Sequence, residues 1–361
     1  MQKSKSPVLG VIKIILLVLV ILIAAVVIFF GVLTIFEYRP DDTETMSYVN
    51  GSETKSLSVG DEVNVLTWNV GYCGLSETAD FFMDGGTQVR SQDKASVSAN
   101  LTAIGDTIAS LDPDVAYLQE VDVNSTRTYG IDEVSALEER MSGLSSTYAP
   151  NFKVLYIPYP VPPMGHMDAG IVTLAKYNLT DATRIQLPCP FSWPVRLGNL
   201  KRCLLVSRVD VEGTDAEFVF VNLHLEAYDD GEGKAAQTAQ LAQFIQSEYE
   251  KGNYVVAGGD FNQSFSNVDT SMYPLQKEDL WMCGTLNVED FSDNWQFVMD
   301  NSTPSCRSLD RAYDPGDDSF QFYMIDGFIV SDNLTVNSVE THDYGFANTD
   351  HNPVTLNVTL K

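Results

Sequence analysis

A continuous apolar segment near the N-terminus constrains the fold of this chain more than any other feature. Residues 14–36 form a run of 23 residues without a charge, nearly all Ile, Leu, Val, Ala or Phe. At about 1.5 Å per residue, a helix of this length reaches roughly 34 Å and crosses the hydrocarbon core of a bilayer. A secretory signal peptide has a shorter apolar core, and a buried soluble helix is rarely apolar on every face. The segment is therefore predicted to be an uncleaved transmembrane anchor.

Charge is distributed asymmetrically around this anchor. Residues 1–13 carry Lys3, Lys5 and Lys13 and no acid. The chain has 22 Lys and Arg against 49 Asp and Glu, a net charge of −27, so removing those three lysines leaves −30 on residues 37–361. Because a basic flank normally stays in the cytoplasm, we expect a single-pass cell-membrane protein whose residues 1–13 are cytoplasmic and whose acidic part lies outside. The acidic surface also argues against a broad clamp for nucleic acid.

The rest of the chain has the composition of a linker followed by one folded domain. Residues 37–60 are rich in Ser, Thr, Asp and Glu, which predicts a solvated acidic linker. Over residues 61–361, apolar runs of strand length alternate with helix-length patterns, and this mixture favours an α/β fold with helices outside mixed sheets. Helices are expected at 97–111 and 234–249, and strands at 63–69, 114–120, 153–157, 169–175, 203–210, 217–224, 254–259, 321–330, 334–341 and 354–360.

Polar residues suited to catalysis follow the ends of several predicted strands. Asp260 and Asn262 come after Gly258-Gly259, and glycines let a ligand approach the backbone closely. Glu120 ends an otherwise apolar strand, where a divalent cation would compensate its charge. With five cysteines and no Cys-x-x-Cys pair, the chain favours oxygen ligands for Mg2+, or for Mn2+ or Ca2+, over a zinc site. Taken singly, each residue is more often a turn former or a solvated strand end, but their combination favours an active site.

Six short motifs occur in order between residues 67 and 354. They are Thr-Trp-Asn at 67–69, Leu-Gln-Glu at 118–120, Asn-Leu-His-Leu at 222–225, Gly-Gly-Asp-Phe-Asn at 258–262, Ile-Asp-Gly-Phe at 325–328 and Thr-Asp-His-Asn-Pro-Val at 349–354. As an ordered set they resemble the endonuclease/exonuclease/phosphatase superfamily, which has the deoxyribonuclease I-like fold. The resemblance implies a four-layer sandwich of two mixed β-sheets flanked by α-helices, and Mg2+-dependent hydrolysis of a phosphoester. It also implies that Glu120 is the principal metal ligand, with Asn69 and Asp350 near the metal or its waters.

The same resemblance assigns catalytic roles to five residues. Asp260 and Asn262 correspond to the pair that positions or activates the attacking water and binds the phosphoryl group. His351 with Asp326 corresponds to the histidine–carboxylate pair at the scissile phosphate, and His224 to the second active-site histidine. Whether Asp260 or a histidine is the general base stays open, because coupled groups share their titration.

Three further residues are weaker candidates for the substrate site. Asp168 precedes a predicted strand and would be the carboxylate partner of His224. Arg202 and Arg307 would meet a substrate phosphate, although exposed arginines are more often solvated surface.

These observations predict a membrane-tethered, metal-dependent phosphoesterase, most simply a phosphodiesterase, in which an activated water attacks in line. Its substrate would be a nucleic acid, a phospholipid or sphingolipid headgroup, or a small phosphoester, and no protein partner is evident. The alternative is a binding or adhesion module that kept the fold and lost the chemistry; the complete set of site residues favours the enzyme. Outside the cell, Cys283 and Cys306 would form a disulfide, with two free buried thiols as the alternative.

Overall fold

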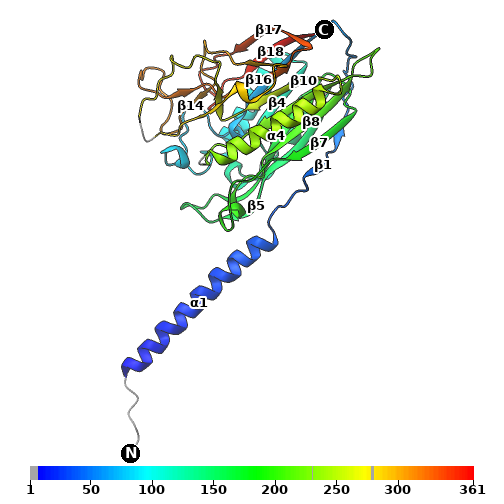
Figure 1. Cartoon of the computed structure of the whole chain (residues 1–361). Coiled ribbons are helices and arrows are strands. Elements are labelled where there is room, and N and C mark those ends of the chain that lie inside the picture. The colour runs from blue at the N-terminus through cyan, green and yellow to red at the C-terminus, as the bar shows by residue number, and fades with distance from the viewer. Residues whose placement is uncertain (1–6, 230, 278–279) are drawn as a thin grey trace, which may run out of the picture.

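The computed structural model describes residues 7–229, 231–277 and 280–361, with one long N-terminal helix standing apart from a folded domain (Figure 1). Within these residues, a single helix is long and apolar enough to cross a membrane, over Val8–Ile35, and its most apolar stretch has no buried residue. This helix, α1 (Pro7–Ile35), is therefore compatible with a membrane span or a signal anchor. Lys3 and Lys5 lie outside the described residues.

Two seven-stranded mixed sheets form the domain. The first has the order β1 (Thr43–Thr45), β7 (Asp181–Gln186), β8 (Cys203–Asp210), β9 (Glu217–His224), β10 (Tyr254–Asp260), β16 (Asp326–Ser331) and β13 (Trp295–Val298). The second has the order β17 (Leu334–Thr341), β18 (Val354–Leu360), β3 (Glu62–Asn69), β4 (Val115–Asp122), β6 (Gly165–Ala175), β5 (Ser145–Ile157) and β2 (Tyr48–Val49). Two small sheets pair β11 (Gln263–Phe265) with β12 (Gly284–Leu286) and β14 (Cys306–Arg307) with β15 (Phe322–Tyr323).

The large sheets pack face to face, and helices cover their outer faces. Alternating side chains, among them Val63, Phe218, Val256 and Phe328, fill the space between the sheets. Helix α4 (Glu232–Tyr249) lies on the first sheet, and Leu241 shares a buried cluster with that sheet's outward-facing residues. Helices α2 (Lys94–Leu111) and α3 (Glu133–Arg140) contribute to the corresponding cluster on the second sheet. The predicted four-layer α/β sandwich is confirmed.

The predicted elements are present, and the structure adds others. Every predicted strand range contains a strand, and both predicted helix ranges fall within α2 and α4. The range 321–330 is divided between β15 and β16. Strand β7 was not expected because Asp-Ala-Thr-Arg-Ile-Gln lacks a run of apolar residues, and its buried Arg184 instead donates to the carbonyl oxygens of Pro150 and Lys201.

Residues 37–60 are largely exposed, as expected, but they are not a separate linker, because parts of them join the domain. Strand β1 pairs with β7 at the edge of the first sheet, and β2 pairs with β5 at the edge of the second. Leu57 is buried in the core between the sheets. Edge pairing uses backbone hydrogen bonds, so a segment with polar side chains joins a sheet without contributing many apolar residues.

A buried carboxylate ties the end of α4 to the first sheet. Glu248 accepts two hydrogen bonds from Arg208, at 2.8 and 2.9 Å, and others from Asn253 and Lys251. Burial opposes ionisation of Glu248, but these donors outweigh it and lower its pKa to about 2. Arg208 also donates to Glu217 at 2.7 Å, so one cluster joins β8, β9 and the last turn of α4.

We expect Glu248→Gln to destabilise the domain by about 3 kcal/mol at neutral pH, because it leaves the half-buried Arg208 without its main counter-ion. A carboxylate with a depressed pKa stabilises the fold fully above the unfolded-state value of 4.5, and this stabilisation is lost as the pH falls toward 2. Thermal unfolding of the detergent-purified chain should show a lower Tm for the variant at pH 7 and a smaller difference at pH 3. Glu139→Gln, which changes an exposed side chain on α3, is the matched control. A pH-independent difference would contradict this account.

Candidate active site

Three ionisable side chains lie on adjacent strands of the first sheet. Phe218 and Phe220 of β9 belong to the core between the sheets, and His224 has the same parity, so it faces the same side. Asp260 of β10 is paired in register with His224 of β9 and with Asp326 of β16. The strand pairing therefore brings two carboxylates and an imidazole together at one end of the inter-sheet layer.

Asp260 is the centre of this group. Its Oδ2 atom lies 3.1 Å from Asn69 Nδ2, 3.3 Å from His224 Nε2 and 3.9 Å from His351 Nε2. Its Oδ1 atom accepts a hydrogen bond of 2.8 Å from the backbone N–H of Asn262. One carboxylate thus contacts groups from β3, β9 and the loop before β18, all of which were predicted to converge.

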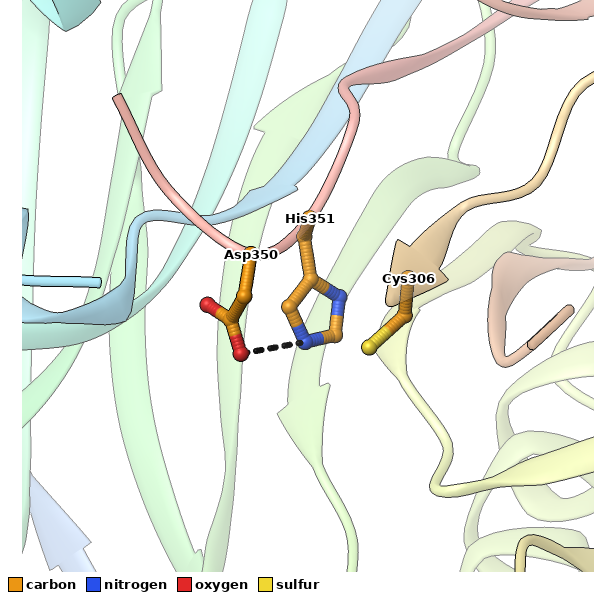
Figure 2. Close-up of side chains that lie close together, drawn as sticks. All are labelled: Cys306, Asp350 and His351. Carbon is orange, nitrogen blue, oxygen red and sulfur yellow. Dashed lines mark ion pairs between the residues drawn. The ribbon is translucent and has the colours of Figure 1, made fainter. Parts of the chain in front are cut away.

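His351 enters the site from the loop between β17 and β18. Its Nδ1 atom lies 2.8 Å from Asp326 Oδ2, and its Nε2 atom lies 4.0 Å from Asp350 Oδ2. Figure 2 shows the imidazole between the Asp350 carboxylate and the sulfur of Cys306, which comes from β14. An isolated backbone bridge between Cys306 and His351 anchors this loop. The ring is therefore oriented by Asp326 on one side and presents Nε2 toward Asp260 and Asp350.

Glu120 reaches the site through an irregularity in β4. By strict alternation it would share the outward face with Ala116 and Leu118, which pack in the α2-side cluster. The pairing of β4 with β6 shifts between Leu118 and Val121, and Glu120 has a left-handed φ of 55°. Such a bulge re-aims a side chain at the cost of backbone strain. The Glu120 carboxylate consequently accepts a 3.4 Å hydrogen bond from Asn69 Nδ2.

Arg127 is a site residue that was not expected from the sequence. Its Nη1 atom lies 3.7 Å from Glu120 Oε2, while its other guanidinium nitrogens donate to Asp122 at 2.9 and 3.2 Å. The guanidinium also lies 3.6 Å from the centre of the Tyr72 ring. Arg127 follows Glu120 in a polar loop, and nothing in its spacing distinguishes it from a solvated arginine.

A buried polar layer separates the apolar core from the site. Gln119 Nε2 donates to Asn222 Oδ1 at 2.8 Å and to Thr67 Oγ1 at 3.2 Å. Asn222 Nδ2 in turn donates to the backbone oxygen of Val172 at 2.8 Å. Because unsatisfied amides are costly in the interior, this network fixes the strand ends that carry the ionisable groups.

Two glycines make the close approaches that the site requires. Gly71 has a φ of 50°, and a Cβ there would lie 2.8 Å from Asp350 Oδ1. Gly259 has a φ of 152°, and a Cβ there would lie 1.9 Å from the backbone oxygen of Leu223. A side chain at Gly71 would displace Asp350, and one at Gly259 would separate β10 from β9.

The buried ionisable groups divide into proton donors and acceptors. Burial and the neighbouring Asp326 raise the pKa of Asp260 to about 7. Burial, helped by the nearby charge of Arg202, lowers the pKa of His224 well below its usual value, so this imidazole is neutral. Burial opposes the charged form of His351, but Asp326 outweighs it and raises the pKa of this histidine well above its usual range. The site therefore holds one imidazolium, one neutral imidazole and a carboxylate that gains or loses a proton near neutral pH.

These groups line a cavity of about 330 Å³. Its polar wall includes Asn69, Glu120, Arg127, His224, Asp260, Asn262, Asp350 and His351. Its apolar wall includes Phe81, Phe82, Met83, Phe152, Ile157, Tyr159, Met164, Leu200, Tyr228 and Trp281. The cavity combines a compact ionic centre with an extended aromatic and aliphatic surface.

The weaker candidates have other contacts. Arg202 and Arg307 line the cavity, but both are buried and already bound. Arg202 donates to Glu226 and to the backbone oxygen of His224. Arg307 donates to backbone oxygens, including that of Ser76 at 2.7 Å, so it holds the loop over the site.

Asp168 is not the partner of His224. It lies 3.3 Å from Lys153 and outside the cavity lining, because β6 carries it away from the β9 strand end. The carboxylate beside His224 is Asp260. All five cysteines, each within the described ranges, are free thiols, so the Cys283–Cys306 disulfide is absent.

The comparisons with known proteins agree with this architecture. A crystal structure of an endonuclease/exonuclease/phosphatase from Beutenbergia cavernae is 18% identical, with a TM-score of 0.54 over 83% of this chain and 72% of that one. One from Bacteroides vulgatus is 15% identical, with a TM-score of 0.52 over 83% of this chain and 100% of that one. TDP2 from D. rerio, complexed with a single-strand DNA product, is 15% identical, with a TM-score of 0.50 over 83% of this chain and 99% of that one. At these identities the likeness shows a shared fold.

No curated protein matches the sequence. The sequence profile of the Endonuclease/Exonuclease/phosphatase family, however, matches residues 66–351, which include the site residues from Asn69 to His351. This match spans most of the folded domain and all six motifs except the last residues of the final one. The chain belongs to the endonuclease/exonuclease/phosphatase family.

Proposed function

We propose that this protein is a divalent-metal-dependent phosphodiesterase whose catalytic domain lies outside the cytoplasm. One observation carries the proposal. The Asn69 amide and the imidazoles of His224 and His351 all lie near the same oxygen, Asp260 Oδ2, at the wall of a cavity. Hydrolysis of a phosphoester needs a proton acceptor for water, a donor to the phosphoryl oxygens and compensation of negative charge. The family to which the chain belongs supports this reaction class.

The donor set fits a hard divalent cation such as Mg2+. Glu120 and Asp350 both line the cavity. Burial is the main cause of the raised pKa of Glu120; Arg127 opposes this effect, and the negative charge of Asp350 adds to it. Arg127 lies 3.7 Å from Glu120 but makes its short contact with Asp122, so its charge is shared between the two carboxylates. A cation held by Glu120 and Asp350 would supply Lewis-acid stabilisation of the phosphoryl oxygens. The Asn69 amide presents its nitrogen to Glu120 and Asp260, so we assign it to holding these carboxylates rather than to the metal.

The residues of the chain divide the proton transfers between them. Asp260, with a pKa of about 7, accepts the proton of the attacking water, because a general base works best when its pKa is near the operating pH. His351, kept charged by Asp326, donates from Nε2 to a phosphoryl oxygen. Asn262 positions Asp260 through its backbone N–H, while its side chain donates to the backbone oxygen of Leu225. Neutral His224 holds the other side of the same carboxylate.

We expect His351→Ala to lower kcat for bis(p-nitrophenyl) phosphate by about 100-fold or more, because it removes a positioned donor to the transition state. His342→Ala is the matched control, because His342 directly follows β17 and its Nε2 atom contacts Thr355 Oγ1 rather than a residue of the site. Release of p-nitrophenol by the detergent-purified chain measures both. Equal activity in the two variants would refute the assigned role of His351.

Removal of divalent cations should abolish the same activity, and Glu120→Gln should weaken its recovery. After treatment with EDTA, we expect added Mg2+ or Mn2+ to restore turnover of the parent chain, whereas the variant should need about tenfold or more metal, as loss of a carboxylate ligand predicts. Glu139→Gln, which changes an exposed carboxylate on α3, should behave like the parent. Full activity in EDTA would exclude metal dependence.

A further inference from the structure

Exposed apolar side chains gather at one end of the catalytic domain. They lie on two segments. One is the end of β5 with the turn that follows it, and the other leads into the short 3-10 helix η4 (Val195–Gly198). We refer to these residues as the apolar rim: Leu155, Tyr156, Tyr159, Val161, Trp193 and Val195. Val161 is 94% exposed and Tyr159 69% exposed. Apolar clusters of this kind on a folded surface mark contact with another apolar phase.

The two segments pack against each other. Helix η4 packs against β5, and a Cβ at Gly198 would lie 3.9 Å from Ile157 Cγ1. The backbone N–H of Lys201, just after η4, donates to the backbone oxygen of Asn151 in β5 at 2.6 Å. Arg90 holds the turn after β5 by donating twice to the backbone oxygen of Pro163. The rim is therefore a built feature of the domain.

The rim also adjoins the C-terminal end of the anchor helix. Trp193 packs edge-on against Phe30 with ring centres 6.0 Å apart, and its Nε1–H donates to Thr34 Oγ1 at 3.0 Å. Glu37, just beyond α1, lies 3.1 Å from Arg196 and 3.5 Å from Lys201. Figure 1 shows the green loops below β5 beside this end of α1. If α1 crosses the bilayer, its end marks the membrane surface, where Trp and Tyr are favoured.

Residues of the same two segments line the cavity. Ile157, Tyr159 and Met164 line it from the β5–β6 connection, and Gly198 and Leu200 line it from η4 and the residues after it. Tyr159 belongs both to the rim and to the cavity wall, and its ring lies 6.0 Å from that of Phe82, deeper in the apolar wall. The apolar wall of the cavity is thus continuous with the rim through Tyr159.

The charges in the cavity do not suit a nucleic-acid track. Among the described residues that line it, the Arg and Lys side chains are Arg127, Arg202 and Arg307, and each is bound to acids or backbone oxygens of the protein. The charged imidazole of His351 is likewise paired, with Asp326. A groove that follows a nucleic-acid backbone needs unpaired Lys or Arg along its length, and residues 37–361 carry a strong net negative charge.

We propose that the apolar rim is a second membrane contact, which seats the cavity mouth on the bilayer, and that the substrate is a membrane lipid with a phosphodiester headgroup. This rests on the proposed phosphodiesterase activity and names its substrate class. The phosphodiester meets Asp260 and His351, and the apolar wall accepts the glycerol or sphingoid portion of the lipid as it leaves the interface. Water adds to phosphorus while Asp260 takes one of its protons, and the P–O bond to the glycerol or sphingoid oxygen breaks. Asp260 then returns that proton to the leaving oxygen, so the products are a neutral alcohol and the phosphomonoester of the headgroup.

The experiment uses the full chain reconstituted in vesicles of phosphatidylcholine, phosphatidylcholine with phosphatidylglycerol, or phosphatidylcholine with sphingomyelin. The test variant combines Val161→Asp and Val195→Asp, two exposed side chains that lie outside the cavity lining. The matched control is Val59→Asp, an exposed valine beside the C-terminal strand, at the end of the domain away from α1. Headgroup release, hydrolysis of bis(p-nitrophenyl) phosphate and hydrolysis of single-stranded DNA are measured on the same preparations.

We expect lipid hydrolysis to fall by about tenfold or more in the double variant, because charged residues do not insert into the interface. Hydrolysis of the soluble diester should stay unchanged, and Val59→Asp should match the parent chain in both assays. Equal lipid hydrolysis in all three proteins would overturn the rim as a membrane contact. Hydrolysis of single-stranded DNA or of the soluble diester, without hydrolysis of any vesicle lipid, would overturn the lipid assignment and leave the phosphodiesterase intact. Failure to hydrolyse any of these substrates would refute both proposals.

Discussion

The site depends on one buried carboxylate held between two imidazoles. Asp260 stands at the end of a central strand, and its position beside His224 and Asp326 follows from the register of β9, β10 and β16. Burial raises its pKa to about 7, while Asn69, His224 and the Asn262 backbone fix its direction. A free carboxylate in water would be a weak base at neutral pH, so the proposed role of Asp260 as a base depends on its place in the interior.

The rest of the site is arranged around that carboxylate by local departures from regular structure. The bulge in β4 turns Glu120 toward the cavity, and the loop before β18 swings His351 over the ends of the strands. Beneath these residues, Gln119 and Asn222 hydrogen-bond to each other, so the layer under the strand ends is polar and its buried amides are paired. Regular sheet supplies the rigid frame, and the irregular positions supply the directions of the reacting groups.

Much of the architecture was predictable from the sequence, because strand ends could be located by apolar patterning and the six motifs by their order. The pairing of His351 with Asp326 is present as predicted. The structure departs from prediction where contacts between residues far apart in the sequence determine the partner of a side chain. Arg307 is captured by backbone oxygens of a distant loop, and Asp168 is taken by Lys153 on the neighbouring strand. The edge strands in residues 37–60 join by backbone pairing, which side-chain composition does not reveal.

The most direct test of the account is a crystal structure of the full chain with Mn2+ and a slowly hydrolysed phosphorothioate diester. We expect an anomalous peak for the cation at the carboxylates of Glu120 and Asp350. We also expect the phosphorus within contact of His351 Nε2, with a water between the phosphorus and Asp260. A diester bound outside the cavity, or a cation held by other residues while Glu120 remains unligated, would contradict it.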